Sequence, residues 1–148
     1  MRIRGFEVVS DYANQNLSLP ERKTRASAGY DLACAKDFVI KAKTHGFVPT
    51  GLKAYMPENE VLQIYPRSSL GFKKSLVLLN SVGVIDSDYY NNEDNEGEIL
   101  IILYNFGDED VLLKKGERIA QGIFMNYLVI DSDENDNLRV GGLGSTGN

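Results

Sequence analysis

The segment 80–90 carries the side chains best suited to chemistry in this chain. Its sequence, NSVGVIDSDYY, places an asparagine, two carboxylates and two aromatic rings at one turn between apolar runs. Asn80 can donate and accept hydrogen bonds, Gly83 lets the backbone approach a ligand, and Asp86 can accept a proton. Tyr89 adds a flat ring. These residues could hold a nucleoside and hydrolyse a group attached to it. They could equally form a tight hairpin, because Asp, Ser and Asn favour turns.

Five other side chains could contact phosphate, water or a metal ion. Arg67, Ser68 and Ser69 follow a strand-like run, where a guanidinium, two hydroxyls and free turn amides would form an oxyanion cradle. Gln121 could position water or phosphate, and Asp31 could hold hydrated magnesium. Each also has a purely structural interpretation, as part of a capped turn, an outward-facing strand residue or an Asx turn.

The chain ends in a polar, glycine-rich tail, residues 131–148. Its glycines would let backbone N–H groups approach a phosphate closely, and Arg139, Ser145 and Thr146 could donate to phosphate oxygens. The tail lacks the Gly-Lys-Ser/Thr of a Walker loop. It cannot bury enough surface to fold alone, so disorder is the simpler expectation for this segment.

The composition fits one soluble globular domain. The 148 residues are 43% hydrophobic and 25% charged, which is enough to bury a core without staples. The net charge of −5 argues against nucleic-acid binding, which needs an extended basic surface. No apolar run approaches the ~18 residues of a membrane span, and the N-terminus lacks the apolar core of a signal peptide. We therefore expect a cytoplasmic protein that binds neither nucleic acid nor membrane.

Two residue types occur once each and restrict the possible chemistry. Cys34 lies in the sequence LACA, which predicts a small buried thiol, and a lone cysteine excludes an intramolecular disulfide. A reducing compartment fits this usage. His45 is the single histidine, which excludes a multi-histidine metal site and argues against a Ser-His-Asp triad.

Apolar residues recur mostly with a period of two, which indicates strands. The strand-like runs are 38–43, 52–56, 61–65 and 99–104, the last of them apolar on both faces as in a central strand. Turn clusters separate them at 44–46, 57–59, 106–108 and 114–117. A short helix is expected within 67–76, and the acidic stretch 91–97 is most simply a solvated loop tip. Short strands at this spacing predict an all-β sandwich or barrel.

Five stretches resemble, in sequence order, the five motifs of the homotrimeric dUTP diphosphatase (dUTPase) family. They are AGYDL at 28–32, PRSSL at 66–70, GVIDSDY at 83–89 with GEI at 97–99, GERIAQ at 116–121, and GGLGSTG at 141–147. The resemblance implies an all-β, distorted jelly-roll (β-clip) subunit, residues 1–130, that assembles as a threefold trimer. Residues 131–148 would then be a flexible arm that closes over a neighbouring subunit's active site.

The same resemblance implies hydrolysis of dUTP to dUMP and pyrophosphate. Asp86 would act as the general base that activates the water attacking the α-phosphorus. Tyr89 would pack beneath the deoxyribose. The uracil would be held by Asn80 and by the backbone of Gly83, Val84 and Ile85. The reaction would limit uracil incorporation into DNA and supply dUMP for thymidylate synthesis.

The phosphate chain and its metal ion would be bound by the remaining motif residues. Mg²⁺ would bridge the phosphates and contact Asp31 through water. The expected phosphate contacts are Arg67, Ser68, Ser69, Gln121, Arg139, Gly144, Ser145 and Thr146. Leu143 stands where the family usually has a phenylalanine that stacks on the uracil. Tyr90 is a candidate substitute for that ring, and Asp88 is expected to hold the shape of the turn.

Two alternatives to a dUTPase remain open at this point. One is a dCTP deaminase-like enzyme, which shares the fold and the trimeric assembly. The other is a trimeric regulatory module that binds a protein partner through residues 91–96, which lengthen the third motif. Assays for pyrophosphate and ammonia would separate the two enzymes.

Overall fold

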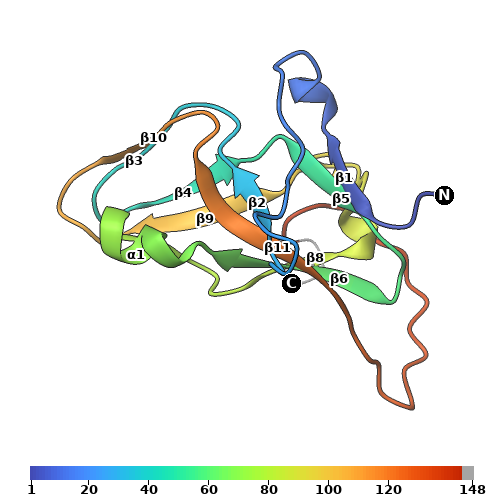
Figure 1. Cartoon of the computed structure of the whole chain (residues 1–148). Coiled ribbons are helices and arrows are strands. Elements are labelled where there is room, and N and C mark those ends of the chain that lie inside the picture. Colours follow the sequence, from blue (N-terminus) through green and yellow to red (C-terminus); the bar gives the residue numbers. More distant parts are fainter. Residues whose placement is uncertain (145–148) are drawn as a thin grey trace.

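Four antiparallel sheets make up the computed structural model, which describes residues 1–144 (Figure 1). The larger sheet has the order β2 (Tyr30–Ala33), β11 (Arg118–Asn126), β6 (Glu60–Pro66) and β8 (Gly83–Asp86). A second sheet has the order β4 (His45–Pro49), β9 (Leu100–Asn105) and β7 (Leu76–Leu78). Two ribbons pair β1 (Gly5–Val8) with β5 (Leu52–Tyr55), and β3 (Phe38–Ile40) with β10 (Val111–Leu113).

The helical segments of the described chain are short. They are α1 (Ser68–Lys74) and two 3₁₀ turns, η1 (Ser10–Tyr12) and η2 (Ser87–Tyr89). The predicted all-β class is therefore confirmed, as is the short helix expected within 67–76. No helix within residues 1–144 is long and apolar enough to cross a membrane.

The hydrophobic core collects the inward side chains of both larger sheets. In β9, Ile101 and Leu103 are fully buried while the alternate residues Leu100 and Ile102 are half-buried, as period-two alternation requires. β9 lies between β4 and β7, which confirms the prediction of a central strand at 99–104. The other fully buried aliphatic side chains of the core are Leu32, Ile40, Val48, Leu62, Leu76, Ile99, Leu113 and Ile119. Cys34 is also buried, as expected.

One predicted turn is misplaced. His45 and Gly46 are the first residues of β4, so the expected turn at 44–46 is wrong. The chain turns earlier, at Lys43, whose φ of 63° lies in the left-handed region, and the Lys43 amide bonds to the carbonyl of Asn105. This turn also ends β3 at Ile40, short of the predicted run to 43.

The segment 80–90 is not a β-hairpin. The strand before it, β7, pairs with β9, whereas β8 pairs with β6, so the two consecutive strands belong to different sheets. Ser81, with φ of 65°, forms the turn between them. The segment therefore bridges the two larger sheets, and the expectation of a hairpin is wrong because pairing with distant strands outcompetes pairing with the neighbour.

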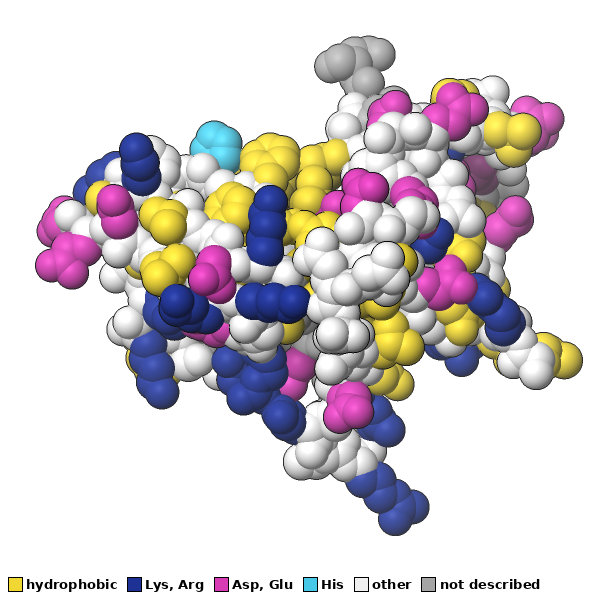
Figure 2. Space-filling model, turned by 90° about the horizontal axis from the view of Figure 1, so that it is seen from above, with side chains coloured by type: hydrophobic (Ala, Val, Ile, Leu, Met, Phe, Trp, Pro, Cys, Tyr) yellow, Lys and Arg dark blue, Asp and Glu magenta, His cyan; other side chains and the backbone are white. Residues whose placement is uncertain are grey.

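The outer face of the sheet β4–β9–β7 is apolar. Phe47, Val77 and Leu79 are 45%, 41% and 49% exposed on this side. Figure 2 shows hydrophobic side chains gathered beside the cyan His45, whose ring lies 5.8 Å from that of Phe47. An exposed apolar sheet face of this kind typically marks a contact with another protein chain.

Candidate active site

Asp86 lies at the point where β8 ends and the chain turns. Its backbone is extended, with φ −71° and ψ 154°, and the next residues form η2. Because β8 ends here, the Asp86 carboxylate points out of the sheet and its side chain is 51% exposed. Its partner across the sheet is Val61, at the beginning of β6. A carboxylate in this position can receive a proton from a bound water molecule.

Tyr89 is fixed beneath the same turn. It is 4% exposed, its hydroxyl donates to the carbonyl of Glu98 over 2.7 Å, and it accepts from the side-chain amide of Asn95 over 2.8 Å. Burial raises the pKa of the Tyr89 hydroxyl, so the phenol stays neutral. The result is a rigid, uncharged ring next to Asp86.

Arg139 brings the C-terminal arm to these residues. Its Nη1 lies 3.1 Å from a carboxylate oxygen of Asp86 and 3.1 Å from one of Asp88, and the guanidinium carbon lies 5.4 Å from the Tyr89 ring centre. Only 8% of the Arg139 side chain is exposed. The structure thus brings the predicted site residue Arg139 against Asp86 and Tyr89, which precede it by 53 and 50 positions in the sequence.

The backbone of β8 forms the adjoining surface. β8 is an edge strand, so alternate N–H and C=O groups from Gly83 to Asp86 have no neighbour in the sheet. Val84 is 59% exposed, and Asn80 is exposed at the turn before the strand. Such an edge offers donors and acceptors that could read the polar edge of a base.

Packing against β6 requires a glycine at position 83, which could not be predicted from the sequence. It is buried opposite Ile64, and a Cβ at this position would lie 2.9 Å from the Ile64 Cβ. Real Cβ atoms essentially never come so close. Close approach of β6, rather than approach of a ligand alone, therefore excludes a side chain here.

Five of the candidates for binding the phosphates or their metal ion form a second group at the other end of β6. Asp31 is paired in register with Gln121, whose amide donates to the carbonyl of Pro66 over 3.2 Å. Ser68 and Ser69 open α1, and Arg67 immediately precedes them. The predicted residues of this group are Asp31, Arg67, Ser68, Ser69 and Gln121.

Arg118 ties this second group together. Its guanidinium lies 3.2 Å from an Asp31 carboxylate oxygen, and its carbonyl accepts a 3.4 Å hydrogen bond from Arg67. The contacts of Arg118 were not predicted from the sequence. Its position in the stretch GERIAQ, three residues before Gln121, is the signal that could have identified it.

The two groups are separated within one chain. Asp86 lies opposite Val61 and the second group surrounds Pro66. The intervening length of β6 is roughly 17 Å, at about 3.3–3.4 Å per residue. Asp86 and Arg67 of the same chain therefore cannot both contact one phosphorus atom.

The structure describes only part of the expected cover of the site. Leu143 is 49% exposed and Gly144 is exposed with φ of 76°. Tyr90 does not replace the missing lid ring. Its hydroxyl bonds to Glu7 and its ring packs against Tyr55, so it supports the β1–β5 ribbon instead. Ser145 and Thr146 lie outside the described residues.

The described residues contain no cluster of three or more His, Cys, Asp or Glu side chains that could hold a metal ion. Asp31 is a single carboxylate, already paired with Arg118. Mg²⁺ often binds proteins through one or two carboxylates together with substrate phosphates. The residues present fit that arrangement and no all-protein cage.

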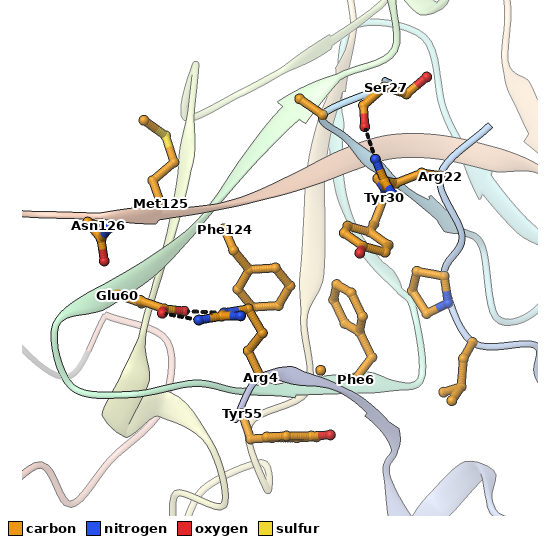
Figure 3. A pocket seen from close by; sticks show the side chains of 14 residues that line it. Arg4, Phe6, Arg22, Ser27, Tyr30, Tyr55, Glu60, Phe124, Met125 and Asn126 are labelled. Atoms are coloured by element: carbon orange, nitrogen blue, oxygen red, sulfur yellow. Dashed lines mark hydrogen bonds and ion pairs between the residues drawn. The ribbon is translucent and has the colours of Figure 1, made fainter. Parts of the chain in front are cut away.

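A cavity of about 670 Å³ lies elsewhere, between β1, β5 and the end of β11. Its floor is a cluster of three rings, Phe6, Tyr30 and Phe124, and the bidentate Arg4–Glu60 pair closes one side (Figure 3). None of the predicted site residues lines it.

The stretch 91–97, expected to be a solvated loop tip, is solvated only in part: Asn91, Glu93 and Asp94 are exposed, but other residues of the stretch contact Tyr89. Asn92 is only 8% exposed, and its amide donates to the carbonyl of Tyr89 over 2.8 Å. Asn95 reaches the Tyr89 hydroxyl, and Asp94 accepts a hydrogen bond from the arm. The sequence could not predict these contacts, because polarity alone does not distinguish internal hydrogen bonds from hydrogen bonds to solvent.

Comparison with known proteins places this geometry in a family. A model of the dUTPase family matches residues 15–147. The deoxyuridine 5'-triphosphate nucleotidohydrolase of Lactococcus lactis subsp. lactis (strain IL1403) is 54% identical over 149 residues, 99% of each chain. That of Rickettsia conorii is 42% identical over 137 residues, 88% of each chain.

Solved structures agree with these relatives. The crystal structure of a dUTPase from Streptococcus mutans matches with a TM-score of 0.83 at 53% identity, covering 86% of this chain and 99% of that chain. A D95N mutant dUTPase from phage phi11 of S. aureus matches with a TM-score of 0.74 at 19% identity, covering 92% of this chain and 98% of that one. At that identity the likeness supports the fold alone.

Proposed function

The chain belongs to the dUTPase family, and on that premise we propose that it hydrolyses dUTP to dUMP and pyrophosphate. The observation that carries the proposal is the meeting of an exposed Asp86 carboxylate, the buried ring of Tyr89 and the guanidinium of Arg139 at the end of β8. The reaction would limit uracil incorporation into DNA and supply dUMP.

In this mechanism Asp86 orients a water molecule and takes its proton as the oxygen attacks the α-phosphorus. The bond from the α-phosphorus to the bridging oxygen breaks, and pyrophosphate leaves with the electron pair. A positioned base of this kind typically contributes about 10²–10⁴-fold to the rate. Arg139, Arg67 and the hydroxyls beside it supply positive charge and donors for the phosphate oxygens.

Selection of uracil would rest on the free edge of β8 and on Asn80. Uracil presents an acceptor at O4 and a donor at N3, whereas cytosine reverses both. Bound cytosine would leave backbone groups of residues 83–85 unpaired, and such mismatches discriminate strongly. Tyr89 would lie beneath the deoxyribose and exclude a 2′-hydroxyl. Its fixed, neutral ring supports this role.

A complete site would combine residues from two subunits. Within one chain β6 separates Asp86 from Arg67, so a neighbour must bring the second group to the first. The exposed apolar face around Phe47 and Val77 supports association between copies of this chain. We propose the homotrimer expected for the family. The prediction that the arm serves a neighbouring subunit stays a prediction, since in the single chain the arm contacts its own residues.

Magnesium bound to the triphosphate would neutralise its charge and favour the departure of pyrophosphate. Asp31 is the residue proposed to meet that ion through water. Its pairing with Arg118 keeps the carboxylate in place at the strand edge.

A nucleotide panel tests the proposal. Purified protein with Mg²⁺ should release pyrophosphate from dUTP and only slowly from dCTP, dTTP and UTP, and it should release no ammonia from dCTP. Release of ammonia from dCTP would instead support the deaminase alternative. Failure to turn over any of the four nucleotides would overturn the proposed activity.

A further inference from the structure

Loop 91–97 begins two residues after Tyr89 and then returns to it. The return is made at Gly97, whose φ of 90° lies in the region that favours glycine. A Cβ at Gly97 would lie 2.8 Å from the Tyr89 carbonyl oxygen and 3.0 Å from the amide nitrogen of Asn91. The end of the loop therefore packs directly against the residue from which the loop departs.

The hydroxyl of Tyr89 has two partners at the end of this loop. It donates to the carbonyl of Glu98 over 2.7 Å, and it lies 2.8 Å from the side-chain nitrogen of Asn95. A tyrosine hydroxyl has one hydrogen, which the Glu98 carbonyl uses. Asn95 must therefore be the donor in the second hydrogen bond.

The loop also determines which way the Asn95 amide faces. Its Oδ1 accepts from the backbone amide of Gly97 over 3.0 Å and from the side-chain amide of Asn92 over 2.8 Å. Both partners are donors, so the oxygen must face them and the NH₂ group must face Tyr89. The backbone amide of Asn95 in turn donates to Oδ1 of Asn92 over 3.1 Å.

The backbone end of Tyr89 is held by the same unit. The side-chain amide of Asn92 donates to the Tyr89 carbonyl over 2.8 Å. Asn92 and Asn95, which bond to each other, thus hold the two ends of one residue. The Tyr89 ring cannot shift without breaking a hydrogen bond at one of these ends.

The outer side of the loop is anchored as well. Lys53, 8% exposed, donates to Asn91 over 2.5 Å and to Glu96 over 2.7 Å, and Glu96 also accepts from the amide of Ser10. The hydrogen bond from Lys53 lowers the pKa of the Glu96 carboxyl, which keeps this anchor charged at neutral pH. The loop is therefore a fixed support on which Asn95 is mounted.

We propose that Asn95 is a positioning residue for Tyr89, whose amide fixes the hydroxyl end of the ring and thereby sets how strongly the site excludes a nucleotide with a 2′-hydroxyl. The inference rests on the proposed function, because it assumes that Tyr89 lies beneath the deoxyribose. Steric exclusion needs a ring that does not yield, since a ring free to shift would make room for one more oxygen atom. If the loop served only to dock another protein, its alteration would leave nucleotide selectivity unchanged.

Asn95→Asp removes the donor with little other change. The substitution keeps an oxygen that can accept from Gly97 and Asn92, but it replaces the NH₂ group that faces Tyr89 with a second acceptor. Asn91→Gly is the matched control from the same loop. Glycine tolerates the Asn91 φ of 57°, and within residues 1–144 the Asn91 side chain bonds to Lys53 alone.

The first experiment compares dUTP with UTP. Asn95→Asp should lower the ratio of kcat/KM for dUTP to that for UTP about fivefold, the size expected for one neutral hydrogen bond. The kcat for dUTP should stay within about twofold of the wild type, with the change in KM, because Asn95 makes no hydrogen bond to Asp86 among residues 1–144. Asn91→Gly should leave both the ratio and kcat near the wild type.

The second experiment is a double-mutant cycle with Tyr89→Phe. This variant lacks the hydroxyl that Asn95 holds, so adding Asn95→Asp to it should change the dUTP:UTP ratio no further. The cycle separates the contact with Tyr89 from any other effect of Asn95 on the loop.

The third experiment needs no substrate. The protein is prepared with isotope-labelled tyrosine, and the Cζ resonance of Tyr89 is identified as the signal that Tyr89→Phe lacks. Loss of the donated hydrogen bond in Asn95→Asp should move this resonance, whereas Asn91→Gly should leave it in place.

The outcomes separate the two levels of inference. In an active enzyme, an unchanged dUTP:UTP ratio in Asn95→Asp, or an equal loss in the Tyr89→Phe background, would overturn the role of Asn95. An unmoved Cζ resonance would overturn the contact itself. A wild type that hydrolyses neither nucleotide would overturn the proposed function and with it the role in selectivity, while the resonance would still show whether Asn95 holds Tyr89.

Discussion

Nη1 of Arg139 lies 3.1 Å from Oδ2 of Asp86, so the cation of the arm and the proposed general base form an ion pair in the ligand-free chain. The Arg139 guanidinium also forms an ion pair with Asp88 and lies over the ring of Tyr89. A water molecule activated by Asp86 must share the carboxylate with this guanidinium or displace it. The arm therefore bears on the base itself as well as on the phosphates.

Replacing the base should separate proton transfer from arm docking. Asp86→Asn should lower kcat at least about 100-fold, because an amide cannot take the proton from water. Asp88→Asn is the matched control, since Asp88 makes the same 3.1 Å contact with Arg139. It should stay within about fivefold of the wild type in steady-state pyrophosphate release. Equal losses in both variants would assign the effect to the arm contact and refute the base.

Mixed assemblies should reveal the shared site. Asp86→Asn and Arg67→Ala chains carrying different tags are co-expressed, and assemblies containing both are isolated by two affinity steps. Each parent should be nearly inactive, whereas the mixture should regain activity, because one interface then pairs an intact Asp86 with an intact Arg67. Continued inactivity of the mixed assembly would mean that both groups act within one chain.

The same method assigns the arm to a subunit. Asp86→Asn chains are mixed with chains ending at Leu138, which keep Asp86 but lack Arg139. If the arm serves its own Asp86, as its contacts within the chain favour, no site contains both groups and the mixture should stay as slow as the shortened parent. Recovered activity would assign the arm to a neighbouring subunit, as the resemblance to the family implies.

The candidate site residues could be proposed from the sequence because they lie in short, ordered motifs. Asp86 and Tyr89 could be named from a single stretch, and the strand at 99–104 from its apolar run, since both depend on local pattern. The local sequence pattern does not say which strands pair with one another, and this pairing could not be predicted. β8 pairs with β6 instead of β7, and that choice moved Gly83 into contact with Ile64.

The internal contacts of residues 91–97 could not be predicted from the sequence, for a different physical reason. Asn and Asp residues satisfy water and backbone groups equally well, so a polar sequence does not say which of the two it meets. Here Asn92 and Asn95 bond to Tyr89 and to their own loop. The assignment of Tyr90 as a lid failed similarly, because its partner Glu7 is remote in the sequence.

Gly83 should be intolerant of even a methyl group. Gly83→Ala places a Cβ 2.9 Å from the Ile64 Cβ, and overpacking of this kind costs about 1–3 kcal/mol of unfolding free energy. In the control, Gly71→Ala, the nearest atom is the Leu76 carbonyl oxygen at 3.7 Å, so the change should be neutral or stabilise α1 by up to about 1 kcal/mol. Urea unfolding at one protein concentration measures both. Similar stability of the two variants would contradict the proposed packing.

The Arg4–Glu60 pair should give the chain a pH-dependent contribution to stability. Arg4 donates two hydrogen bonds, of 2.8 and 2.6 Å, to a Glu60 side chain that is only 10% exposed, and they hold the Glu60 pKa below its ordinary value. Because the folded pKa is depressed, the contribution is full above the pKa of an unfolded glutamate, about 4.3, and is lost as pH falls through the lower folded pKa. Glu60→Gln should therefore lower the urea midpoint at pH 7, and its deficit relative to the wild type should shrink below about pH 4.3. Glu58→Gln is the control, since the exposed Glu58 carboxylate makes no hydrogen bond or ion pair within residues 1–144. A deficit for Glu60→Gln that stays constant down to pH 3.5 would show that the pair does not titrate in this way.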